Sequence, residues 1–190
     1  MRHLRPEDYR VMPWKNGGGV TTEIAIYPEG TGISGAGFIW RVSIADVAVD
    51  GPFSRFPGYD RHIMTIAGKG MRLEARDHGA IDLSRRFVPR EFSGDWDVDG
   101  QLIDGPVRDF NLMVERERAT GTLVVETLRE RKRYAAGDDT LLLHVLEGDG
   151  VAEARIIAEG DTLILSPHKS VAVTPSSDEL RLAVVRIAGR

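Results

Sequence analysis

Hydrophobic and polar positions alternate along most of the chain with the period of two that is typical of β-strands. In the run Val20–Tyr27, the even-numbered residues are predicted to share one face and the odd-numbered residues the other. The run Phe38–Val47 repeats this pattern, with Trp40 on its apolar face and Arg41 on the opposite one. Further strand-like runs are Arg61–Ile66, Phe110–Val114, Thr122–Leu128, Leu141–Leu146, Thr162–Leu165 and Leu180–Ile187.

Turn sequences separate these runs at short intervals, and one short helical turn is predicted at Pro6–Arg10. The 21 glycines and 9 prolines suit many short strands joined by tight turns. The pattern therefore predicts an all-β fold, either a sandwich or a barrel. The predicted turns are Gly51-Pro52, Pro57-Gly58, Gly68-Lys69-Gly70, Asp104-Gly105-Pro106 and Gly148-Asp149-Gly150.

An internal repeat favours two related halves. Thr65–Met71 resembles Val145–Val151, which begins 80 positions later, and both are predicted to be an apolar strand entering a Gly-x-Gly hairpin. A period this long indicates a duplicated domain rather than a solenoid. The alternative is chance recurrence, because Gly-x-Gly turns are common in β proteins.

Composition excludes several classes of partner and site. The net charge is −4, and the one basic run, Arg129–Arg133, is interrupted by Glu130, so neither nucleic acid nor an anionic membrane is an expected partner. There is no cysteine, which rules out disulfides and thiolate chemistry. The N-terminus lacks the apolar core of a signal peptide and no run could span a bilayer as a helix, so the cytoplasm is the expected location.

The segment Trp14-Lys15-Asn16-Gly17-Gly18-Gly19 is the densest local signal for a binding site. Successive glycines allow backbone N–H groups to converge on an anion, Lys15 adds a cation and Trp14 an apolar wall. The order of residues differs from a Walker loop. A flexible turn without a ligand explains the same composition equally well.

Polar side chains also recur at alternate positions on three strands, opposite apolar faces. These pairs are Thr21/Glu23, Arg41/Ser43 and Asp109/Asn111, and Arg61 follows an aromatic, proline-rich loop, 51–60, that is suited to form a pocket rim. If they point inward, they predict a polar interior that needs a ligand or internal ion pairs. A solvent-facing Glu23–Arg41 pair is the alternative, and Asp109 has the alternative role of capping a turn.

No bound metal or other cofactor is expected. The five histidines are scattered and none forms the His-x-His pair that places two ligands on one face of a strand. His62 and His144 lie on apolar strands, where a core role is the commoner outcome. No serine lies in a nucleophile-elbow sequence.

Three blocks of sequence together resemble the HutD/Ves family. They are 14–24, then 40–61 with Trp40-Arg41-Val42-Ser43 and Gly51-Pro52-Phe53-Ser54-Arg55-Phe56-Pro57-Gly58, and finally Asp109-Phe110-Asn111-Leu112-Met113. They span roughly the first 115 residues in order, whereas the remainder fits by length and strand pattern alone. The resemblance implies a bicupin, that is, two fused double-stranded β-helix (jelly-roll) barrels. The expected organisation is one compact unit over 1–190 with approximate halves 1–115, holding the ligand pocket, and 116–190.

The resemblance also implies a link to histidine utilisation, in which HutD is viewed as a governor that binds an intermediate such as formylglutamate or urocanate. The resulting hypothesis is a metal-independent protein that binds a small carboxylate; formation of a homodimer is left open. The alternative is a metal-independent isomerase or hydrolase with Glu23 or Asp109 as base and Lys15 as acid, and a third is a regulatory module acting through a protein partner. The predicted ligand-binding residues are Trp14, Lys15, Asn16, Glu23, Arg41, Ser43, Arg61, Asp109 and Asn111.

Overall fold

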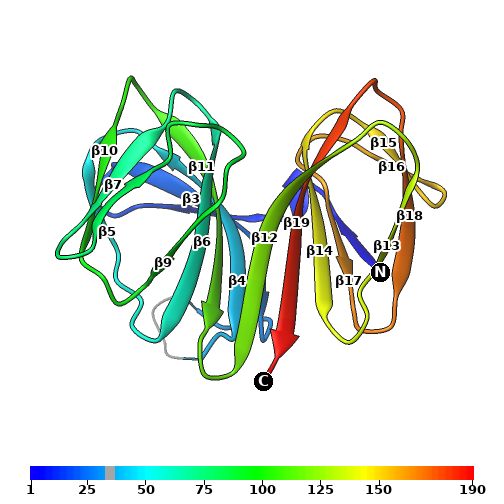
Figure 1. The fold of residues 1–190 in the computed structure, drawn as a ribbon, viewed down its shortest axis with the longest axis horizontal. Coiled ribbons are helices and arrows are strands. Elements are labelled where there is room, and N and C mark those ends of the chain that lie inside the picture. Colours follow the sequence, from blue (N-terminus) through cyan, green and yellow to red (C-terminus); the bar gives the residue numbers. More distant parts are fainter. Residues whose placement is uncertain (33–36) are drawn as a thin grey trace. The chain divides into compact units, whose positions relative to one another are not determined.

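The chain folds almost entirely into antiparallel β-strands in the computed structural model, which describes residues 1–32 and 37–190 (Figure 1). The all-β prediction is confirmed, and within these residues the one helical element is a 3₁₀ turn at Pro6–Asp8. The strands form two compact units. We call residues 10–120 with Arg190 the N-terminal unit, and residues 1–9 with 121–189 the C-terminal unit.

The N-terminal unit contains two antiparallel sheets. The larger sheet has the order β2-β3-β4-β11-β6-β9, formed by Arg10–Pro13, Gly19–Tyr27, Trp40–Val47, Val107–Glu115, Tyr59–Ala67 and Arg90–Ser93. The smaller sheet has the order β5-β10-β7-β8, formed by Gly51–Phe53, Val98–Leu102, Met71–Ala75 and Gly79–Asp82. Buried apolar side chains from both sheets form one cluster, which includes Val47, Ile63, Leu73 and Val98.

The C-terminal unit is also built from two sheets. The larger has the order β1-β17-β14-β19-β12, formed by Arg2–Leu4, Thr162–Leu165, Thr140–Glu147, Leu180–Gly189 and Ala119–Leu128. The smaller has the order β13-β18-β15-β16, formed by Lys132–Ala135, Ser170–Pro175, Gly150–Ala152 and Arg155–Ile157. Its core is a continuous apolar cluster that includes Leu143, Leu163, Val173 and Leu182.

Eight strands in each unit follow the same order. Neighbours β4-β11-β6-β9 in the N-terminal unit correspond to β12-β19-β14-β17 in the C-terminal unit, and β5-β10-β7-β8 correspond to β13-β18-β15-β16. Every strand from β4 to β11 therefore has a counterpart eight strands later. This correspondence supports the internal duplication that the sequence repeat indicated.

The two Gly-x-Gly segments are corners between sheets, so their prediction as hairpins is wrong. The first joins β6 to β7 and the second joins β14 to β15, and in each case the two strands belong to different sheets. The chain makes close backbone contacts at these corners. A Cβ atom on Gly68 would lie 2.5 Å from the carbonyl oxygen of Pro106, and one on Gly148 would lie 2.4 Å from that of Glu179.

The predicted alternation of Val20–Tyr27 is interrupted by a bulge in β3. Glu23 lies opposite Ser43, as expected for one shared face, but the register shifts between Glu23 and Ala25. Ile26 then lies opposite Arg41, on the face that the odd-numbered residues were predicted to occupy. An extra residue in one strand produces this change of face.

The first nine residues belong to the C-terminal unit, although the sequence division placed them in the first half. Strand β1 pairs with β17, and His3 Nε2 lies 2.9 Å from Asp161 Oδ2. The Tyr9 hydroxyl donates to the carbonyl oxygen of Gly160 at 2.5 Å and lies 2.7 Å from Thr162 Oγ1.

Candidate functional site

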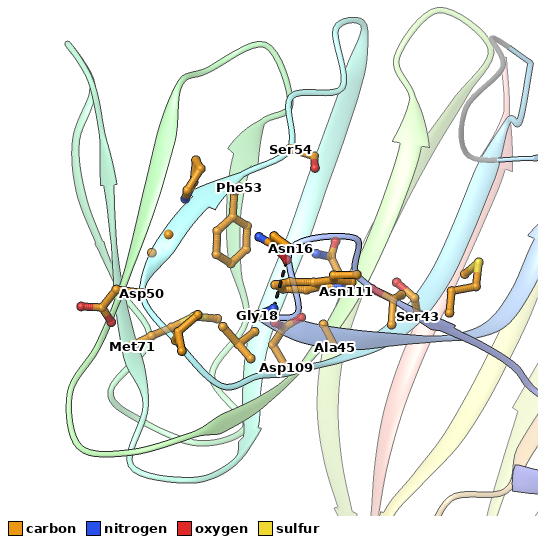
Figure 2. Close-up of a pocket in the computed structure, with 18 of the residues that line it drawn as sticks. Asn16, Gly18, Ser43, Ala45, Asp50, Phe53, Ser54, Met71, Asp109 and Asn111 are labelled. Atoms are coloured by element: carbon orange, nitrogen blue, oxygen red, sulfur yellow. Dashed lines mark hydrogen bonds between the residues drawn. The ribbon is translucent and has the colours of Figure 1, made fainter.

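A cavity of about 540 Å³ lies within the N-terminal unit, with walls supplied by both of its sheets and by the loop after β2. Figure 2 shows Asn16, Phe53, Asp109 and Asn111 around this space. Eight of the nine predicted binding residues line it: Trp14, Lys15, Asn16, Arg41, Ser43, Arg61, Asp109 and Asn111.

Strand register brings the polar residues of the larger sheet to one face. Met113 on β11 lies opposite Arg41 on β4 and opposite Arg61 on β6. Asn111, two residues before Met113 on β11, lies opposite Ser43 on β4. Since directly paired residues project from the same face of a sheet, the i, i+2 spacing in the sequence places these side chains together.

Glu23 does not line the cavity; it lies behind Arg41 as that residue's partner. Arg41 Nε donates to Glu23 Oε2 at 2.7 Å, and the two side chains are 5% and 8% exposed. The solvent-facing pair considered from the sequence is thus wrong. Burial lowers the pKa of Arg41 and the bond to Glu23 opposes that shift. Arg41 Nη2 is buried and has no hydrogen-bond partner among the described residues.

Arg61 is held in an aromatic enclosure. Its guanidinium carbon lies 4.8 Å from the ring centre of Phe92, 5.5 Å from that of Phe53 and 5.8 Å from that of Phe56. Nη1 makes a long bond of 3.4 Å to the carbonyl oxygen of Ser54, while Nε is without a partner in the described part of the chain. Burial lowers the pKa of Arg61 to about 10, and Asp109 acts in the opposite direction.

Asp109 is 1% exposed, and neither of its carboxyl oxygens has a hydrogen-bond partner within residues 1–32 and 37–190. Burial raises its pKa to about 7, against the opposing effect of Arg61. The turn-capping alternative is therefore wrong, because Asp109 lies inside β11 and caps nothing. Asn111 Oδ1 is also buried without a partner in this part of the structure.

The glycine loop forms one wall, but two of its N–H groups are already used. Gly17 N donates to Trp14 O at 3.1 Å, and Gly18 N donates to Asn16 Oδ1 at 3.0 Å (Figure 2). The expectation that these glycines offer a set of free backbone donors is thus corrected, because a side-chain turn closes the loop on itself. Trp14 is fixed by a bond of 2.7 Å from Nε1 to Thr21 Oγ1.

The predicted aromatic rim is present, and a third wall was not predicted. Gly51 to Ser54 and Phe56 line the cavity, as the composition of loop 51–60 indicated. Met71, Gly100 and Leu102 line it from β7 and β10. Both strands alternate apolar or glycine residues with polar ones, but over only five positions each, and they were not among the predicted runs.

Neither a metal cluster nor a membrane-spanning helix is present among the described residues. They contain no group of three or more metal-ligating side chains placed to share an ion. They also contain no helix long and apolar enough to cross a membrane.

A family model described as HutD matches residues 6–184. A Pseudomonas putida protein described as an uncharacterized 21.2 kDa protein in the hutC 3′ region is 45% identical over 118 residues, which are 60% of this chain and 58% of that protein. Protein Ves of Escherichia fergusonii is 40% identical over 110 residues, 56% of this chain and 55% of that protein. The match therefore spans less than two thirds of either relative.

Solved structures match over 90% or more of this chain. A conserved protein of unknown function from Pseudomonas aeruginosa PAO1 has 36% identity and a TM-score of 0.87, with 98% of each chain covered. HutD from Pseudomonas fluorescens SBW25, described for a formate condition, has 34% identity and a TM-score of 0.83, covering 100% of this chain and 98% of that one. A cupin 2 conserved barrel domain protein from Leptotrichia buccalis, at 11% identity and a TM-score of 0.59 over 90% and 89% of the chains, shows likeness of fold alone.

Proposed function

Because the chain belongs to the HutD family, which is linked to histidine utilisation genes, we propose that it binds a small carboxylate metabolite of histidine catabolism in this cavity. The ligand we propose is formylglutamate-like or urocanate-like and the role regulatory. We also propose that the two units are the two barrels of a bicupin, which the shared strand order and the cupin-like neighbours support.

The observation that carries the binding proposal is a set of unpartnered polar atoms in the cavity wall. Buried polar groups cost free energy unless they are hydrogen-bonded, so their concentration in one cavity points to an external partner. A carboxylate accepts hydrogen bonds from guanidinium groups, and an amide or imidazole N–H donates to a carbonyl oxygen. The buried unpartnered atoms on the wall are Arg41 Nη2, Arg61 Nε, both carboxyl oxygens of Asp109 and Asn111 Oδ1.

Calorimetry with N-formyl-L-glutamate, trans-urocanate and formate tests the proposal. Formate enters the panel because a solved HutD is described for a formate condition. We expect saturable binding of at least one acid by the unmodified protein. Arg61→Met should weaken that binding by about 10- to 100-fold, the equivalent of about 1.5–3 kcal/mol for a hydrogen bond to a charged group.

Arg108→Met is the matched control, because Arg108 is half-exposed and bonds to Asp46 at 2.7 Å outside the cavity wall. Its affinity should equal that of the unmodified protein. Absence of saturable binding for all three acids would overturn the proposed function.

A metal-independent isomerase or hydrolase is the second candidate, and the state of Asp109 favours it. A cavity carboxyl with a pKa of about 7 is suited to proton transfer at neutral pH, whereas Glu23 is already bound to Arg41 and does not line the cavity. Turnover of a panel acid that is lost in Asp109→Asn would promote this candidate over binding alone.

A further inference from the structure

Asp109 and Arg61 bring opposite charges to the wall of one cavity without a hydrogen bond between them. Both residues are buried, at 1% and 6% exposure, and Asp109 lacks any hydrogen-bond partner among the described residues. Burial alone does not explain this arrangement, because a carboxylate and a guanidinium that only stabilised the fold would be expected to pair directly.

The charge balance of the cavity depends on the proton of Asp109. The charge of Arg41 is already balanced by Glu23. The charge of the buried Arg61, in contrast, is balanced only when Asp109 is ionised. When Asp109 is ionised, it compensates Arg61 and the wall attracts no anion at this point. When Asp109 is protonated, Arg61 presents an uncompensated positive charge inside a region of low dielectric.

We propose that Asp109 is a specificity-determining residue that binds the ligand in its neutral, protonated form, donating a hydrogen bond to the ligand while Arg61 holds the ligand's carboxylate. This inference rests on the proposed function. When the ligand carboxylate binds to a protein in which Asp109 is ionised, the Asp109 carboxylate takes up one proton from solution. Binding therefore takes up a proton wherever the free protein has Asp109 ionised.

The local electrostatics support this coupling. Burial raises the pKa of Asp109 to about 7 and Asp46 raises it further, whereas Arg61 lowers it. A bound anion beside Arg61 screens that cation from Asp109 and repels the Asp109 carboxylate, so it raises the pKa of Asp109 again. By linkage, each pH unit above the pKa of the free protein should weaken binding about tenfold.

The other charged groups around Asp109 do not explain such a dependence between pH 6.5 and 8.5. Strands β7 and β10 contribute only apolar or glycine residues to the wall. His62 projects from the opposite face of β6 to Arg61, 3.2 Å from Glu91, and burial lowers its pKa below 6.5. The charged groups facing the cavity or acting on Asp109 are Lys15 from the loop after β2, Arg41 with Glu23 from β4 and β3, Asp46 from β4, Asp50 before β5, and Arg61 from β6.

Calorimetric titration of N-formyl-L-glutamate at pH 6.5, 7.5 and 8.5, in phosphate and in Tris, tests the inference. The ligand's own carboxyl groups, with ordinary pKa values near 4, stay ionised over this range. For the unmodified protein we expect the Kd to rise about tenfold between pH 7.5 and 8.5. The buffer supplies the proton that is taken up on binding. The measured heat should therefore differ between phosphate and Tris by the difference in their heats of ionisation for about one proton.

Asp109→Asn keeps a neutral side chain that can donate a hydrogen bond. Its Kd should therefore not change with pH, and its heat of binding should be the same in both buffers. Asp46→Asn is the comparison variant: it removes a carboxylate outside the cavity that raises the pKa of Asp109, so the pH dependence should remain but begin at a lower pH. A wild-type Kd that is constant from pH 6.5 to 8.5 would overturn this inference and leave the proposed function standing. No saturable binding of any panel acid at pH 6.5 would overturn the proposed function itself.

An infrared difference spectrum of the unmodified protein tests the protonation of Asp109 without relying on the folding of the Asp109→Asn variant. Addition of N-formyl-L-glutamate at pH 8.5 should produce the carbonyl stretch of a newly protonated carboxyl group. Saturable binding without that band would overturn the inference.

Discussion

Ionisable side chains occupy interior positions of the N-terminal unit that its fold does not require to be polar. The counterpart of β6 in the C-terminal unit is β14, whose Leu141, Leu143 and Val145 are buried in an apolar core. The counterpart of β11 is β19, which contributes Leu182 and Val184. The same strand order is thus compatible with an apolar core, so the fold itself does not require the polar cavity wall of the other unit.

Arg41→Met should lower the free energy of unfolding by about 3–5 kcal/mol, since it leaves the buried Glu23 carboxylate without its partner. Urea unfolding at pH 7 measures the change. Arg41→Met combined with Glu23→Leu should recover most of the loss, because removing both charges leaves no unpaired ion. A loss below about 1 kcal/mol in the single variant would show that the pair is not a buried structural contact.

Asp109→Asn should change how stability depends on pH. The pKa of Asp109 is raised from 3.8 to about 7, so the folded state holds this proton more tightly than the unfolded state. The resulting stabilisation is full below pH 4, declines as the pH rises, and is absent above about pH 7. It corresponds to about 4 kcal/mol, because each pKa unit is worth about 1.4 kcal/mol.

Urea titrations of both proteins from pH 4 to pH 8 isolate this contribution as a difference. The unfolding free energy of the unmodified protein, minus that of the variant, should fall across the interval. A constant difference would mean that Asp109 is ionised throughout.

Spacing on single strands and the composition of two loops both pointed to residues of the candidate site. The pairs Arg41/Ser43 and Asp109/Asn111 project into the cavity because alternation alone determines which side chains share a face. Glu23 was included for the same reason, but periodicity cannot distinguish a residue on the wall from one bonded behind it. The glycine loop carried no signal for its internal hydrogen bonds, which depend on the rotamer of Asn16.

At the scale of elements, long alternating runs were predictable and short strands were not. All eight predicted runs coincide with observed strands, although β4 begins at Trp40 rather than Phe38. Strand β5 has three residues and is too short to show a period. Strands β7 and β10 do alternate, but over only five residues each, and they were not among the predicted runs. The bulge at Ile24 was also invisible, because an extra residue in one strand is defined by the register of its partner.

Gly19→Ala tests how tightly the loop after β2 is set against the sheet. A Cβ atom at this position would lie 2.4 Å from the carbonyl oxygen of Asp46 and 3.0 Å from the ring of Trp14. Backbone on one side and a cavity-lining ring on the other leave no room, so we expect a loss of about 1–3 kcal/mol in stability. Binding of N-formyl-L-glutamate should weaken as well, because Trp14 has to move.

Gly189→Ala is the control for this variant, since a Cβ there meets nothing within 4 Å and its φ is not positive. Thermal unfolding and calorimetry should show this protein unchanged. Equal behaviour of the two variants would indicate that the loop is free to shift away from the sheet.

At the scale of the whole molecule, one topology is used twice with different interiors. The sequence revealed the duplication only at the Gly-x-Gly corners, where close backbone contacts demand glycine in both units. Elsewhere the two interiors have diverged, one towards a closed apolar core and the other towards a polar cavity. The proposed binding site therefore belongs to the N-terminal unit alone, and its effect on each unit can be measured separately.

Native-state hydrogen exchange should make that separation visible. Each unit has its own core cluster, so each is expected to open as its own cooperative unit. A ligand at 100 times its Kd stabilises the unit that binds it by about 2.7 kcal/mol, which slows exchange through opening of that unit by about 100-fold. With N-formyl-L-glutamate present, we expect this added protection in the amides of β4, β6 and β11, and none in β14, β17 and β19. Equal added protection in both sets would show that the chain opens as a single unit, and protection in the second set alone would move the binding site to the C-terminal unit.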